Sequence, residues 1–124
     1  MDSAQALYNF WSGFTWKAYD ENTVPSEGFV PEMPRITYGV ATTEFGDAIT
    51  LPASLWDRSY SWEKISQKAD EIYNYIGLGG RIVQYDTGAL WIKRGMPFAQ
   101  RMSDEDDSVR RIYLSIEVEY FTAK

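Results

Sequence analysis

The chain has 124 residues, a net charge of −6, no cysteine and no histidine. A chain of this length fits one domain with a single core, and zero cysteine excludes disulfides, a thiolate nucleophile and a cysteine zinc site. The acidic balance disfavours capture of nucleic acid, because phosphate binding depends on Lys and Arg. No basic leader and no apolar run of about 20 residues is present, so we expect a folded cytosolic protein without a membrane span.

The amino end has the spacing of a short amphipathic helix. Apolar residues recur at helical intervals over residues 1–14, Asp2 and Ser3 are candidate caps, and Gly13 closes the pattern. Residues 15–34 hold three prolines, which exclude regular structure. We therefore expect a helix and then an ordered loop whose apolar side chains can still lie on the core: Trp16, Tyr19, Val24 and Phe29.

Two further elements follow in residues 35–77. Apolar side chains alternate over residues 35–56 on both sides of a break at Gly46 and Asp47, which predicts a β-hairpin. From Trp62 the period changes to that of a helix with one apolar stripe. Ser61 is the natural N-cap of this helix, and the glycines that begin at Gly77 stop it. The apolar stripe comprises Trp62, Ile65, Ala69, Ile72, Tyr73 and Ile76.

The remainder has the pattern of strands. A turn at residues 86–88 separates two apolar runs, and the charged residues 103–108 separate the second run from the clearest alternation in the chain, over residues 109–121. The order helix, hairpin, helix, strands indicates α+β architecture. We expect a single domain over residues 1–124, with a largely antiparallel sheet and two α-helices packed on one face.

Reactive constellations are scarce. Without histidine or cysteine the usual general base and activated nucleophile are missing. Glu117 and Glu119 lie two apart on one predicted strand and could form a carboxylate pair, but the preferred interpretation is a solvated sheet face. The acidic run at residues 103–107 lacks the glycine and the final glutamate of a calcium loop. We therefore expect no catalytic residue, no metal and no cofactor.

Aromatic residues exceed what a small core requires, with five Trp, nine Tyr and six Phe. Some of them are expected to meet a partner protein. The segment "SLWDRSYSWEKI" is interpreted first as a strand-to-helix junction with a turn at Asp57, and also as a possible subunit contact. The hypothetical interface residues are Trp56, Asp57, Arg58, Trp91 and Arg94.

The layout resembles the tail terminator, or tail completion, proteins of long-tailed bacteriophages and prophages. The resemblance rests on the aromatic helix "LYNFWSGF", the approach "VPEMPRITYGV", the junction "LWDRSYSWEKI", the "GG" before a hairpin and the final "IKRGMPFAQRMSDEDDSVRRIYLSIEVEYF". It covers nearly the whole chain. These are patterns of element order and aromatic placement, with no catalytic signature among them.

This resemblance implies a structural subunit of the virion, assembled in the bacterial cytoplasm. Such subunits form a ring, commonly a hexamer, on the last ring of the tail tube protein, which stops tube growth and offers a docking surface to the head connector. A closed ring needs two different complementary patches on each subunit. DNA would pass through as cargo without specific binding, and an acidic lumen would suit that passage. The lumen candidates are Asp104, Glu105, Asp106 and Asp107.

Three alternatives remain at this stage. A head completion or stopper protein of the phage neck also forms rings, but such proteins tend to be small β-barrels. A small hydrolase could use Glu117 and Glu119. A nucleic-acid-binding module would show DNA affinity that falls steeply with salt, which the acidic charge disfavours.

Overall fold

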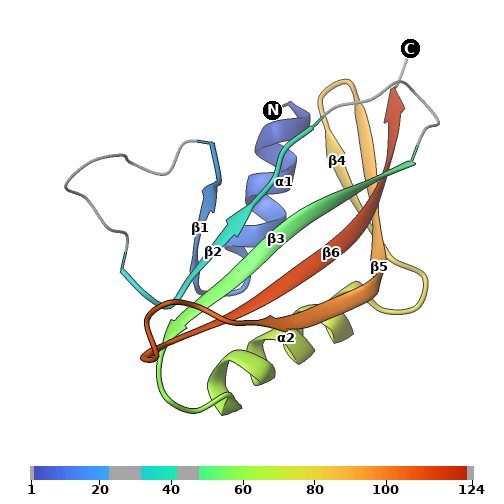
Figure 1. The fold of residues 1–124 in the computed structure, drawn as a ribbon. Helices are drawn as coiled ribbons and strands as arrows, with labels where there is room; N and C mark the ends of the chain where they lie inside the picture. Colours follow the sequence, from blue (N-terminus) through green and yellow to red (C-terminus); the bar gives the residue numbers. More distant parts are fainter. Residues whose placement is uncertain (1, 23–31, 42–47, 123–124) are drawn as a thin grey trace.

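The computed structural model describes residues 2–22, 32–41 and 48–122. These residues form an α+β fold of two helices and six strands (Figure 1). In chain order they are α1 (Ser3–Ser12), β1 (Lys17–Asp20), β2 (Arg35–Tyr38), β3 (Ala48–Arg58), α2 (Glu63–Ile76), β4 (Arg81–Tyr85), β5 (Gly88–Met102) and β6 (Val109–Thr122). Neither helix is long and apolar enough to cross a membrane within these described ranges.

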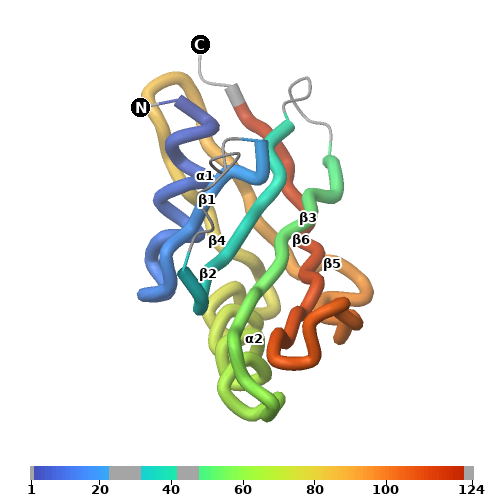
Figure 2. Tube along the Cα trace, turned by 60° about the vertical axis from the view of Figure 1, so that its left-hand side comes forward, coloured from blue at the N-terminus to red at the C-terminus, as the bar shows by residue number. Residues whose placement is uncertain are grey.

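The strands make one sheet in the order β1-β2-β3-β6-β5-β4. Every neighbouring pair is antiparallel except β1 and β2, which run parallel. The largely antiparallel sheet predicted from the sequence is therefore confirmed. The sheet curls, so that α1 lies beside both outer strands, β1 and β4 (Figure 2).

One face of the sheet carries the core. Along β6 the side chains alternate between half-buried and buried from Arg111 to Phe121, because successive residues of a strand point to opposite faces. Both helices pack on the buried face, as predicted, and they meet each other where the Tyr75 ring lies 5.4 Å from that of Phe14. Neither α1 nor α2 covers the opposite face. We call it the open face. The inward residues of β6 are Ile112, Leu114, Ile116, Val118 and Tyr120.

The helix boundaries follow local chemistry. In α1 the Asp2 carboxylate accepts a hydrogen bond from the Gln5 amide at 2.9 Å, which satisfies one free amide of the first turn. The N-cap of α2 is Trp62, which makes no side-chain cap bond, so the predicted cap Ser61 lies one position too early; the Ser61 hydroxyl still accepts from the Glu63 amide at 3.1 Å. Gly77 ends α2 with φ of 72°, a conformation that favours glycine.

Two sequence predictions need correction. Residues 17–20 form strand β1, where the sequence predicted a loop. The strand was missed because it pairs with β2 in parallel, and no local sequence pattern indicates such a pairing. The turn expected at Asp57 is wrong, since β3 continues to Arg58 by pairing with β6. The predicted break at Gly46 and Asp47 and the core positions of two loop side chains lie outside the described residues; those side chains are Val24 and Phe29.

Candidate subunit interface

Trp56 lies on the open face between two arginines. The register places it beside Arg35 of β2 and Arg111 of β6. Their guanidinium carbons lie 5.0 and 4.4 Å from the centre of the indole ring, within the range of cation–π attraction. The indole Nε1 donates to the Thr37 hydroxyl at 3.0 Å. This predicted interface residue therefore belongs to a polar, half-buried stack on the open face.

Asp57 points to the opposite side of β3 from Trp56. Its side chain is only 3% exposed, and the Lys64 ammonium of α2 lies 3.8 Å from Oδ1. A carboxylate buried this deeply offers little surface to another subunit. Its ionic contact instead joins the end of β3 to the beginning of α2.

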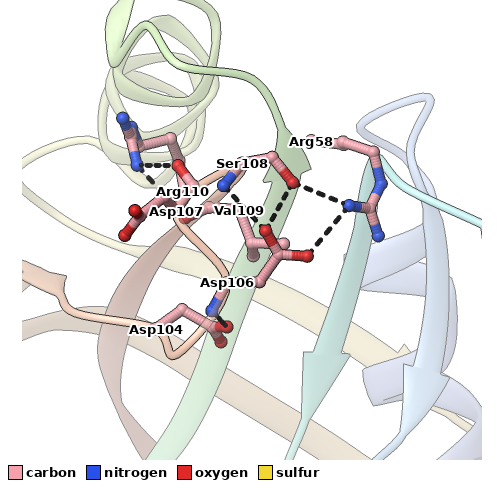
Figure 3. Close-up of polar contacts among 7 residues, drawn as sticks. All are labelled: Arg58, Asp104, Asp106, Asp107, Ser108, Val109 and Arg110. Atoms are coloured by element: carbon pink, nitrogen blue, oxygen red, sulfur yellow. Dashed lines mark hydrogen bonds and ion pairs between the residues drawn. The ribbon is translucent and has the colours of Figure 1, made fainter.

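Arg58 holds the turn between β5 and β6 (Figure 3). Its Nη1 donates to Asp106 Oδ2 at 3.2 Å and to the Ser108 hydroxyl at 2.9 Å. Asp106 Oδ1 also accepts from the Ser108 amide at 2.8 Å and from the Ser108 hydroxyl at 2.6 Å. The hydrogen bonds from Ser108, then the one from Arg58, hold the pKa of Asp106 below its usual value because they favour the charged form. We call residues 103–108 the acidic tip.

The acidic tip is a folded turn fastened to the rest of the molecule. Asp104 Oδ1 accepts from the Asp106 amide at 3.0 Å, and Arg110 donates to the carbonyls of Asp107 and Tyr60 at 3.0 and 2.9 Å. The side chains of Glu105 and Asp107 are exposed and have no partner among the described residues. Over the same residues, no group of three acidic side chains is arranged to hold a metal ion.

Trp91 lies at the other end of the open face. The register pairs Trp56 with Arg111 and Trp91 with Glu119, eight residues further along β6, a separation of about 26 Å by strand rise. The Trp91 indole donates to the Gly79 carbonyl at 2.8 Å, and the Lys93 ammonium lies 4.2 Å from its ring. The structure thus does not bring the five predicted interface residues together.

Lys93 pairs with one of the two carboxylates considered as a catalytic pair. Its ammonium lies 2.7 Å from Glu119, and this hydrogen bond raises the pKa of Lys93. Glu117 is the register partner of Lys93 on the same face. A carboxylate neutralised by a cation is a poor general acid, so the arrangement favours a charged, partly solvated surface over acid–base chemistry.

Arg94 binds the carboxyl end of α2. Its Nε donates to the Tyr73 carbonyl at 3.0 Å, and its guanidinium carbon lies 3.4 Å from the Tyr73 ring. Arg81 does the same on Tyr75, with a bond of 2.6 Å to the carbonyl and 4.4 Å to the ring. Sequence reasoning missed Arg81. A signal was available, since α2 has no basic residue in its last turn and cations favour that end of a helix.

A groove of about 460 Å³ runs between the two helices and the outer strand β4. Its apolar lining comes from α1 and its end, from α2 and from β4. Large apolar side chains close to it are exposed, with Leu78 at 97% and Ile82 at 67%. Aromatic and apolar surface beside arginine is typical of protein interfaces. The apolar lining residues are Phe10, Phe14, Tyr75, Ile82 and Val83.

No protein-family model matches the chain. Comparison with curated proteins finds no match either. Among solved structures, the chain is similar to a chain of the virion of a native gene transfer agent (GTA) particle, with a TM-score of 0.61 and 17% identity over 94% of this chain and 90% of that one. At this identity the likeness shows a shared fold.

Proposed function

We propose that the protein is a structural component of a phage or phage-like virion that forms a ring on the end of the tail tube. The observation that carries the proposal is the fold likeness to a chain of a virion, which extends over nearly the full length of both chains. The position at the tail end, the hexameric ring and the contacts with tube and connector are what the resemblance in the sequence implies. In this role the protein stops tube growth and receives the head connector.

The surface chemistry suits a subunit of an assembly. Charged and aromatic side chains lie at both ends of the open face, with Trp56 and its two arginines at one end and Trp91 with Lys93 at the other. A ring requires two different patches on each subunit. We propose that Trp56 and Arg58 lie on one patch, with Asp57 supporting it from inside. Trp91 and Arg94, which point to opposite faces at the other end of the sheet, belong to the second patch.

Deletion of the gene from its phage or prophage tests the function. After induction, the lysate is imaged by negative-stain electron microscopy, and a copy of the intact gene supplied in trans is the control. We expect overlong tail tubes of variable length, separate from filled heads. Free tails of normal length beside emptied heads would instead indicate a neck stopper. Intact infectious particles would overturn the assembly role.

A matched complementation tests the hydrolase alternative. The double variant Glu117→Gln, Glu119→Gln removes both carboxylates but keeps side-chain size. We expect it to restore infectious particles to the same titre as the intact gene. If it fails while circular dichroism shows an unchanged fold, the non-enzymatic proposal is wrong.

A further inference from the structure

Two arginines lie side by side at the carboxyl end of α2. Arg81 of β4 pairs directly with Ile92 of β5, and Arg94 is two residues beyond Ile92, so both arginines are on the same face of the sheet. Diagonal neighbours of this kind are about 7–8 Å apart. We call Arg81 and Arg94 the arginine pair.

Each member of the pair is held in place by α2. The Nε atoms bind the carbonyls of Tyr75 and Tyr73, and the guanidinium planes lie against the rings of the same residues. The terminal Nη groups of both arginines have no partner among the described residues. A guanidinium fixed through Nε presents its Nη fork without further loss of side-chain freedom, which lowers the entropic cost of binding.

The pair carries more positive charge than its surroundings neutralise. The end of a helix supplies about half a negative charge, against two guanidinium charges here. Leu78, almost fully exposed, lies on the connection between α2 and β4, and the apolar groove begins beside Tyr75. The surface therefore suits a partner that presents carboxylates close to a small apolar contact.

We propose that the arginine pair binds the acidic tip of a second copy of this chain. This inference rests on the proposed ring and names the contact that closes it. The chain itself supplies the complementary charge, since Glu105 and Asp107 are exposed on the tip while Arg58 and Ser108 hold Asp106 in place. Both surfaces are thus ordered before they meet.

The two surfaces lie at opposite ends of α2. Arg110 connects the acidic tip to the beginning of α2, because it donates to the carbonyls of Asp107 and of Tyr60. The arginine pair binds the last turn of α2. Figure 1 shows the β5–β6 turn near the beginning of α2 and the start of β4 near its end. Fourteen helical residues separate these ends by about 21 Å. A patch at one end that fits a different patch at the other gives a head-to-tail contact, which closes into a ring when the rotation permits. The acidic tip then lies between subunits and not in the lumen, where the sequence suggested it.

Disulfide trapping tests the contact directly, because the natural chain has no cysteine. The double variant Leu78→Cys, Ser103→Cys places one thiol on each surface and leaves Glu105 and Asp107 in place, since Ser103 is an exposed residue of the acidic tip. These positions are too far apart for a bond within one chain. Under mild oxidation of the purified protein we expect a ladder of oligomers on a non-reducing gel. The control, Asp70→Cys with Ser103→Cys, moves one thiol to the exposed middle of α2 and should give no ladder.

Charge exchange tests the chemistry of the contact. Glu105→Lys with Asp107→Lys alters exposed side chains of the tip and is expected to reduce trapping at least about tenfold. Arg81→Glu with Arg94→Glu should have the same effect. Combining the four changes in one chain should restore the ladder, because the charges are complementary again. Raising the salt concentration from about 0.05 to 0.5 M should weaken trapping of the test cysteine pair in the chain that carries no charge reversal.

The outcomes separate this contact from the proposed function. Equal ladders from the test and control cysteine pairs, or no ladder from either, would overturn the contact. So would trapping that the charge reversals leave unchanged. Gene deletion that gives overlong tails, together with failed trapping, would keep the tail-end role and reject only this interface. Trapping together with intact infectious particles after deletion would show self-association without that role.

Discussion

Asp106 accepts the hydrogen bonds that fold the acidic tip. Because its pKa is lowered in the folded chain, its contribution to stability is fully present above the unfolded pKa near 3.9 and is lost as the pH falls through the folded pKa. Ser108→Ala removes the hydroxyl that donates to Oδ1 at 2.6 Å. We expect the pKa of Asp106 to rise toward its usual value, and we would measure it by NMR titration of the carboxyl carbon.

Ser103→Ala is the matched control for that experiment. Ser103 is an exposed serine of the same tip and donates no hydrogen bond to Asp106. Its replacement should leave the titration of Asp106 unchanged. An equal shift in both variants would show that general loosening of the turn, and not the Ser108 hydroxyl, sets the pKa.

Arginine or lysine side chains lie over six aromatic rings, four of them tryptophan. Trp62 lies between Arg101 and Arg110, as Trp56 lies between its own two arginines. Composition counts rings but cannot show which cation lies over each one, because the partners come from other strands. The excess of aromatics thus reflects cation–π packing within the chain as well as surface for a partner.

The connection between α2 and β4 contains two adjacent glycines, of which one has room for a side chain and the other does not. Gly80 has φ of 79°, and a Cβ there would lie 2.6 Å from the Ile92 carbonyl oxygen. A Cβ at Gly79 would meet nothing within 4 Å. We expect Gly80→Ala to lower the free energy of unfolding by at least about 2 kcal/mol, and Gly79→Ala to change it by less than about 0.5 kcal/mol.

Urea denaturation followed by tryptophan fluorescence measures both glycine variants. The same slope with a lower midpoint for Gly80→Ala would indicate a loss of stability in the native turn. Equal midpoints for the two variants would contradict the steric account. A Gly80→Ala protein that still folds can also be examined by disulfide trapping, because Gly80 directly precedes Arg81 of the arginine pair.

Elements with a local pattern were predictable from the sequence, and elements defined by distant partners were not. The stripe of α2 and the alternation of β6 predicted both elements, because burial of one face leaves a period in the chain. Strand β1 was missed because its pairing with β2 is parallel and spans a long connection. Arg58 was predicted as a contact residue, but its bond to Asp106 depends on the register of β3 with β6 across 48 residues.

The whole molecule carries 18 acidic and 12 basic residues, and this balance predicts its behaviour toward DNA. Net repulsion should prevent the counterion release that drives non-specific binding. We expect no binding of a fluorescent 30-base-pair duplex at about 0.15 M salt up to protein concentrations of about 10⁻⁴ M, by fluorescence anisotropy. Binding that strengthens as salt is lowered would contradict the role of DNA as passing cargo.

The sheet order has a consequence for synthesis of the protein. Of the six described strands β6 is made last, yet it lies in the middle of the sheet between β3 and β5. Before β6 is synthesised, β3 and the β4–β5 hairpin have no strand that pairs with both. Helix α1 packs against β4 and β5, which are synthesised some 70 residues after it. A prematurely terminated product therefore lacks the strand that joins the two halves. We expect such fragments to leave the edges of β3 and β5 unpaired, so an incomplete subunit would not present the folded surfaces that an assembly requires.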